Sequence, residues 1–147
     1  TPKLAVGYFR ESPFSTTWKA NWMKIPFKGS PAGDCYSTNA DLLRFAGALR
    51  GGKLLKTATL AKMFEEPIQM GPGAIVAGFG ERLSHGRHIR GHQGGIEGIT
   101  TNLAMVWETQ GAVALTSNQG QNLTWLFAEH IADLLAAEDN KPAKPRP

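Results

Sequence analysis

Gly91-His92-Gln93-Gly94-Gly95-Ile96-Glu97-Gly98 is the most informative stretch of this 147-residue sequence. Four glycines among eight residues disfavour a helix and are costly in an ordinary strand, because glycine loses the most backbone entropy on folding. Such a segment suits a strand that a ligand approaches closely, with the imidazole of His92 directed at the same place. We therefore expect a binding strand here, supported by the rest of the fold.

Apolar and polar residues alternate on both sides of this stretch, which predicts an antiparallel sheet. The expected strands are residues 75–83, 87–91, 99–107 and 112–117. Short connections, such as Ser84-His85-Gly86, favour a meander of three or four antiparallel strands. One face of the strand at 99–107 is expected to consist of Ile99, Thr101, Leu103, Met105 and Trp107.

Three helices are expected beside this sheet, at residues 39–50, 58–65 and 122–137. Thr38 and Asp41 have the spacing of a capping box before the first helix, and Thr57 is the expected cap of the second. The apolar stripe of the first helix is Leu42, Phe45, Ala46 and Leu49. The stripe of the last helix is Leu123, Phe127, Ile131 or His130, Leu134 and Leu135. The expected fold class is therefore α+β, with an antiparallel sheet flanked by helices.

The N-terminal region is less regular. Residues 4–9 predict a short strand, and the prolines from Pro13 to Pro31 predict a long ordered loop after it. The aromatic residues of this loop, Trp18 and Trp22 among them, either fill a groove or form a wall of a substrate site. Residues 1–139 are expected to form one domain, followed by a disordered, charged and proline-rich tail at 140–147.

The composition, with 41% hydrophobic and 19% charged residues, is that of a globular domain. Lys141, Lys144 and Arg146 account for three of the four net positive charges, so the remainder is nearly neutral and no nucleic-acid partner is expected. No apolar run is long enough to cross a membrane. The sequence begins at Thr1 rather than at a methionine, from which we expect a processed product or a fragment.

Candidate reactive groups are few. On a strand, His88 and His92 lie about 13 Å apart at about 3.3 Å per residue, too far for one ion, so no metal site is expected. No cofactor is expected either. No serine is followed three residues later by lysine, and Gly-x-Ser-x-Gly is absent. The single cysteine, Cys35, is either a thiol nucleophile with a nearby histidine or a small structural residue.

Four segments resemble, in order, landmarks of the serine β-lactamase-like superfamily, which includes class C β-lactamases, D-alanyl-D-alanine carboxypeptidases and related esterases. Residues 31–45 are similar to its "PAGGLYST-x-x-DL-x-RF" segment, and residues 4–8 to its "LA-x-GY" strand. Residues 91–98 resemble its third active-site motif, Lys-Thr-Gly or His-x-Gly, and residues 112–118 the strand before its last helix. Asp34 and Cys35 depart from the pattern, and histidine in place of lysine is closer to the esterase and peptidase branches.

The resemblance implies the C-terminal part of a β-lactamase/transpeptidase-like fold and a serine hydrolase that transfers acyl groups from amides or esters. In that family the Ser-x-x-Lys and Tyr-x-Asn motifs precede the "LA-x-GY" strand, so this chain alone is expected to be inactive. His92 corresponds to the third-motif residue beside the reacting carbonyl, and Gly95 to a backbone N–H of the oxyanion hole. Gln93 and Gly94 correspond to the substrate-binding part of the strand.

Such a chain is expected to need a partner, either the missing N-terminal half of the domain or a second chain. Its substrate would be a small amide, ester or β-lactam. A missing half also predicts an exposed sheet edge and an apolar face, and hence a dimer or a domain swap. Family habit favours the bacterial periplasm or secretion, although cytoplasmic members exist. The alternative is a non-catalytic binding or oligomerisation module derived from such a hydrolase.

Overall fold

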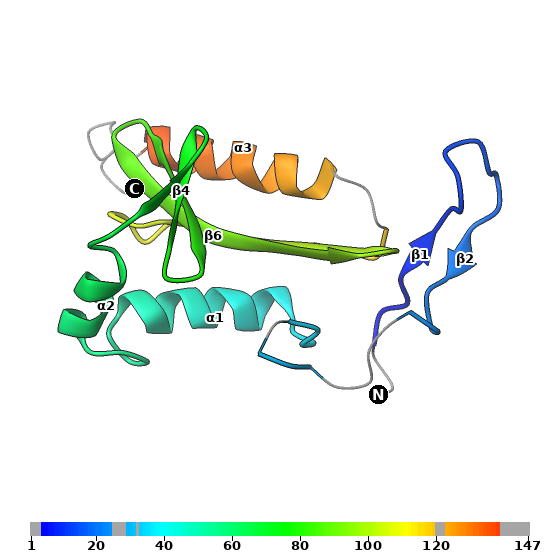
Figure 1. Cartoon of the computed structure of the whole chain (residues 1–147), viewed down its shortest axis with the longest axis horizontal. Helices are drawn as coiled ribbons and strands as arrows, with labels where there is room; N and C mark the ends of the chain where they lie inside the picture. The colour runs from blue at the N-terminus through cyan, green and yellow to red at the C-terminus, as the bar shows by residue number, and fades with distance from the viewer. Residues whose placement is uncertain (1–3, 25–28, 32, 120–122, 139–147) are drawn as a thin grey trace, which may run out of the picture.

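The computed structural model describes residues 4–24, 29–31, 33–119 and 123–138. Its centre is an antiparallel sheet of six strands whose spatial order follows the chain, so the α+β fold class is confirmed (Figure 1). The strands are β3 (Ile68–Met70), β4 (Gly73–Val76), β5 (Phe79–Ser84), β6 (Arg87–Ile96), β7 (Ile99–Val106) and β8 (Ala112–Ser117). The sheet is larger than the expected meander of three or four strands, because β3 was not predicted and residues 75–83 are two strands.

Two-residue turns explain why the sheet contains an extra hairpin. The turn between β4 and β5 is Ala77-Gly78, and both residues have positive φ, 44° and 85°. The turn between β5 and β6, His85-Gly86, has the same character, with φ of 50° and 76°. Such turns match the right-handed twist of paired strands. Alanine rarely adopts this conformation, so no signal in the sequence indicated a turn at Ala77, and residues 75–83 were predicted as one continuous strand.

Two helices lie on one face of the sheet. The helix α1 (Asn39–Arg50) was predicted with the correct bounds, and the Thr38 hydroxyl accepts a hydrogen bond from the Asp41 backbone N–H at 3.1 Å. The helix α2 (Thr57–Met63) begins one residue earlier than expected. Thr57 is therefore its first helical residue rather than its cap, and Lys56 occupies the cap position without a side-chain hydrogen bond.

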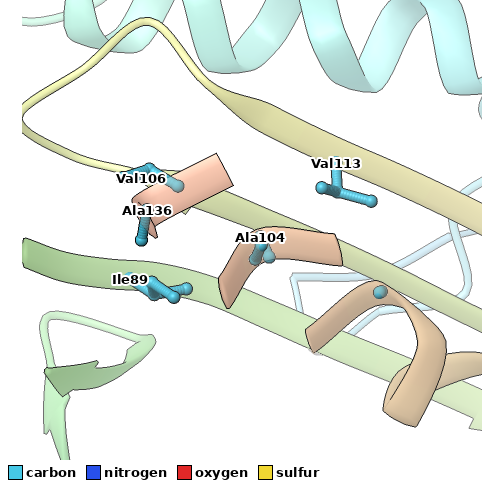
Figure 2. Close-up of a cluster of buried hydrophobic side chains, with 7 residues drawn as sticks. Ile89, Ala104, Val106, Val113 and Ala136 are labelled. Atoms are coloured by element: carbon cyan, nitrogen blue, oxygen red, sulfur yellow. The ribbon is translucent and has the colours of Figure 1, made fainter. Parts of the chain in front are cut away.

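The core has two layers, one on each face of the sheet. Towards α1 and α2, the buried side chains are Ala46, Leu49, Leu60, Leu103 and Met105, as the alternation in residues 99–107 predicted. On the other face lies α3 (Leu123–Glu138), as Figure 1 shows. Figure 2 shows the layer beneath it, where β6, β7 and β8 contribute Ile89, Ala104, Val106 and Val113.

The buried stripe of α3 differs from the prediction. Small residues at four-residue spacing face the sheet: Thr124, Ala128, Ala132 and Ala136. The expected apolar stripe is largely exposed, with Phe127 60% and Leu134 52% accessible, and only Leu135 packs against the core. Short side chains let the helix approach the sheet closely, so the larger residues are directed sideways. Phe45 in α1 was also expected to be buried and is exposed.

The N-terminal region forms a small hairpin of β1 (Tyr8–Phe9) and β2 (Lys19–Ala20), so the strand predicted at 4–9 is shorter than expected. The hairpin lies beyond the end of β6 in Figure 1. Asn21 fixes it there, because its Nδ2 donates to the Glu97 carbonyl at 2.8 Å and its backbone N–H donates to the Gly7 carbonyl at 2.9 Å. Gly7 and Gly98 are in contact at this junction, where neither has space for a Cβ.

Candidate active site

The glycine-rich stretch forms the second half of β6, where the strand has a free edge. β5 pairs with Arg87–Gly91 and no further, because β5 begins at Phe79, directly after the Ala77-Gly78 turn. Residues 92–96 therefore pair with β7 alone within the described part of the chain. On their other side the backbone is open to a ligand.

The hydrogen-bond pattern determines which backbone groups face that open edge. The Trp107 N–H donates to the His88 carbonyl at 2.8 Å, so His88 directs its backbone groups towards β7. The register between β6 and β7 continues without interruption to Ile96, and in an antiparallel pair the direction alternates with every residue. His92 and Gly94 therefore bond to β7, whereas the N–H and C=O groups of Gln93 and Gly95 are directed to the open edge.

Side chains alternate in the same way. His92 lies opposite Leu103, on the face of the sheet that α1 covers, and its exposed imidazole has no hydrogen-bond partner among the described residues. Gly94 shares that face, where a Cβ would lie 3.2 Å from the Thr101 hydroxyl. Gln93 points to the opposite face, towards α3. The structure thus brings His92 and the open backbone of Gln93 and Gly95 to one edge.

A hollow of about 970 Å³ lies beside this edge. Gly78 and Phe79 at the start of β5 form one side of it, and His92 and Gln93 form another. Its apolar lining includes Met70 and Ile75, with Trp125 of α3. A second hollow, of about 690 Å³, continues along residues 93–97 and shares Gln93 and Trp125 with the first. Together they form a cleft along the open edge of β6, which we call the β6 cleft.

Asn102 and Trp125 also line the β6 cleft, and sequence reasoning did not single out either residue. Asn102 is a polar residue in the otherwise apolar buried part of β7, and this break in the pattern is the signal that would have identified it. Trp125 carried no such signal, because an aromatic residue within a helix pattern is ordinarily interpreted as part of the core.

The other candidate residues lie apart from the cleft. His88 is paired with Glu108, whose Oε1 is 2.5 Å from Nδ1, and this side chain lies beside the β7–β8 turn. Partial burial raises the pKa of Glu108, but hydrogen bonds from the side chain and backbone of His88 outweigh it, so the pKa is below its ordinary value. Within the described residues, no three potential ligands form a metal-binding group.

Cys35 is exposed, and its sulfur contacts the Gly33 carbonyl at 3.8 Å. No histidine is hydrogen-bonded to it within the described residues, so the structure gives no support to a thiol–imidazole pair. In the same part of the chain, no helix is long and apolar enough to cross a membrane.

Comparisons with known proteins were consistent with this geometry. The sequence model of the family described as Beta-lactamase matches residues 2–138. A search of curated proteins found no match. Among solved structures, the crystal structure of a penicillin binding protein from Bacillus halodurans superimposes with a TM-score of 0.71 at 21% sequence identity. The aligned region covers 92% of this chain and 39% of that chain, so the present chain spans well under half of that neighbour.

Proposed function

Since this chain belongs to the beta-lactamase family, we propose that it forms the third-motif part of a serine hydrolase that acts on a small amide, ester or β-lactam. The observation that carries this proposal is the open edge of β6. The backbone of Gln93 and Gly95 faces a cleft there, and the imidazole of His92 lies at the same edge. By the family resemblance, these positions correspond to the third active-site motif.

In the proposed reaction, a serine outside this sequence attacks the carbonyl carbon of the substrate. The carbonyl oxygen becomes negatively charged and accepts hydrogen bonds from the Gly95 N–H and from the serine's own N–H. The carbon–nitrogen or carbon–oxygen bond then breaks, and the leaving group takes the proton that the serine hydroxyl released. Water hydrolyses the acyl-serine, which releases the acid and regenerates the hydroxyl.

His92 is proposed to act beside the reacting centre. Its imidazole is exposed and free of competing hydrogen bonds in the described residues, so it is available to the leaving group or to the substrate. An imidazole offers one nitrogen that can donate a hydrogen bond and one that can accept it. Gln93 and Gly94 are proposed to hold the substrate as an additional extended segment. Gln93 supplies backbone hydrogen bonds, and Gly94 leaves its side of the strand unobstructed.

The nucleophile is proposed to come from polypeptide outside these residues, either the N-terminal half of the same domain or a second chain. Two surfaces support this. β8 is the last strand of the sheet and, except for a bridge between Tyr8 and Gln119 after its end, pairs only with β7 within the described residues. The exposed apolar stripe of α3, with Phe127 and Leu134, also lacks a covering layer there. An added strand and helix would cover both.

The same two surfaces favour the alternative function, a non-catalytic module that pairs with a second copy. A dimer or a domain swap through β8 and α3 would cover them equally well. The periplasm or the cell exterior is the proposed location for the hydrolase, in line with the habits of the family.

The test is to express the chain together with the polypeptide that bears Ser-x-x-Lys, and to treat the assembly with a fluorophosphonate. Intact masses are then measured for every chain. The proposal requires a mass increase on the other polypeptide and none on this chain, and slower ester turnover when His92 is replaced by alanine. A mass increase on this chain, or unchanged turnover of His92→Ala, would contradict it. A dimer that resists labelling would favour the non-catalytic module.

A further inference from the structure

The half of β6 that carries the candidate site is supported mainly at its end. Residues 92–97 are all exposed, and residues 92–96 pair with β7 alone within the described part of the chain. Gly98, in the turn that leads into β7, is buried instead. A segment with one paired side and little packing opens easily, whereas a hydrogen-bond donor of an active site must keep a fixed position. The turn at Glu97-Gly98 is therefore where this half of β6 can be held.

The N-terminal hairpin of β1 and β2 contacts that turn through three groups. Asn21, directly after β2, is 1% exposed, and its Nδ2 donates a hydrogen bond to the Glu97 carbonyl at 2.8 Å. The Lys24 ammonium forms an ion pair with the Glu97 carboxylate. The Gly98 backbone lies so close to the hairpin that a Cβ there would be 2.8 Å from the Tyr8 nitrogen. The Asn21 side chain is buried, whereas the ion pair is exposed, so we expect the Asn21 hydrogen bond to restrain the turn more strongly.

A second anchor ties the hairpin to the end of β8. The Tyr8 N–H donates to the Asn118 carbonyl at 2.8 Å, and the Asn118 Nδ2 donates to the Val6 carbonyl at 3.1 Å. Tyr8 also forms a parallel bridge with Gln119. Because β8 is two strands away from β6, the hairpin is attached at two separate points along one end of the sheet. Asn21 therefore holds the β6–β7 turn relative to the rest of the sheet, not relative to a free loop.

We propose that Asn21 is a positioning residue, which holds the β6–β7 turn and through it keeps residues 92–96 in the geometry that the site requires. Asn21 lines neither hollow of the β6 cleft, so it acts through the turn alone. The Glu97 carbonyl that Asn21 binds is only two residues from Gly95, so a displacement of the turn also displaces the Gly95 N–H. That Gly95 is an oxyanion donor rests on the proposed function, whereas the restraint on the strand does not.

Amide hydrogen exchange of the 147-residue chain, followed by NMR, tests this restraint residue by residue. The N–H groups of Gly94 and Ile96 bond to β7 in the open half of β6. In Asn21→Ala these two groups should exchange about three- to ten-fold faster, which is the size expected for the loss of one hydrogen bond. The N–H of Arg90 also bonds to β7, but in the half of β6 that β5 covers, and its exchange rate should not change.

Asn118→Ala is the matched control, because it removes an amide-to-carbonyl hydrogen bond of the same kind from the other anchor of the hairpin. The backbone hydrogen bond between Tyr8 and Asn118 remains in this variant, so exchange in the open half of β6 should keep its wild-type rate. If Asn21→Ala does not fold, Asn21→Leu fills the same space without a donor and takes its place. Unchanged exchange in the open half, an equal acceleration in the half that β5 covers, or an equal response to Asn118→Ala would each overturn the proposal.

The assembled hydrolase gives a second readout. A donor that acts in the transition state affects kcat rather than KM, so Asn21→Ala should lower kcat for a p-nitrophenyl ester about ten-fold at an unchanged KM, a smaller effect than complete loss of the donor. An unchanged kcat together with faster exchange would show that the turn is held for stability alone, and would overturn the positioning role. If serine labelling fails while exchange responds as expected, the proposed function is wrong and the restraint on the strand stands.

Discussion

Replacing Gly95 by proline tests the proposed oxyanion donor with little disturbance of the fold. Proline removes the backbone N–H and nothing else that the sheet uses here, because the Gly95 N–H faces the open edge of β6. In the assembled hydrolase, loss of one oxyanion-hole donor should reduce turnover by about 10²- to 10³-fold, equivalent to about 2.7–4 kcal/mol of transition-state stabilisation.

Gly94→Pro is the matched control. The two glycines are equally confined, since a Cβ would lie 3.3 Å from the Ile99 carbonyl oxygen at position 95 and 3.2 Å from the Thr101 hydroxyl at position 94. The Gly94 N–H, however, belongs to the ladder with β7. Proline there leaves the Thr101 carbonyl unpaired and should lower the free energy of unfolding by about 1–3 kcal/mol.

Two measurements separate these effects. Urea unfolding of the 147-residue chain, followed by circular dichroism, should show a lower midpoint for Gly94→Pro and a change within about 1 kcal/mol for Gly95→Pro. Turnover of a p-nitrophenyl ester by the assembled hydrolase should show the large loss for Gly95→Pro. If Gly95→Pro unfolds as readily as Gly94→Pro, the assigned direction of the backbone groups is wrong. If it folds and retains full turnover, Gly95 is not an oxyanion donor.

Three further predictions concern the packing around the sheet. The Arg50 guanidinium donates hydrogen bonds to four carbonyls of residues 106–111, so Arg50→Ala should lower the free energy of unfolding by about 2 kcal/mol. Arg50→Lys should recover little of this stability, because one ammonium group cannot reach all four carbonyls. Chemical denaturation that finds the lysine variant as stable as wild type would contradict this prediction. Burial raises the pKa of Asp133, but hydrogen bonds from Ser84 and Arg82 outweigh it and lower the pKa below 3.8. A carboxyl whose pKa is lowered in the folded state stabilises the fold above its unfolded-state pKa, and this stabilisation is lost as the pH falls through the folded-state pKa. The stability of Asp133→Asn should therefore decline less steeply at acidic pH than that of wild type. Identical profiles of melting temperature between pH 6 and 2 would argue against this prediction. Ala128→Leu should overpack the layer between α3 and the sheet and lower the free energy of unfolding by about 1–3 kcal/mol. Phe127→Ala, at an exposed position, should change the free energy of unfolding by less than about 1 kcal/mol. If thermal melts show the larger loss for Phe127→Ala, α3 is rotated from the orientation described.

Capping residues and glycines next to a helix were sufficient to predict the bounds of that helix. The helix α1 was placed at its observed bounds because Thr38 caps its start and Gly51-Gly52 follows its end. The extra hairpin was not predicted, because Ala77 adopts a left-handed conformation that alanine rarely takes. For α3, the larger residues dominate any apolar pattern. The sequence alone does not reveal that alanines every four residues let the helix lie close to the sheet.

The sequence indicated residues for the candidate site but not the geometry of that site. The composition of residues 91–98 and the family resemblance together indicated His92 and Gly95. The free edge of β6, however, depends on where β5 begins, which in turn depends on the unpredicted turn at Ala77-Gly78. The buried Oδ1 of Asn102 has no donor within the described residues, and no sequence pattern expresses such an absence.

Because the register of β6 is uninterrupted, the direction of each backbone group in the site depends on whether its residue is at an odd or an even position along the strand. From Arg87 to Ile96, even-numbered residues bond to β7, and odd-numbered residues face β5 or the open edge. A single residue inserted between Gly91 and His92 would exchange the two sets for the residues that follow it. The Gly95 N–H would then turn inward to β7, and the imidazole would move to the α3 face. Substitutions in this strand change one group at a time, whereas a one-residue change in length would reverse the whole site at once.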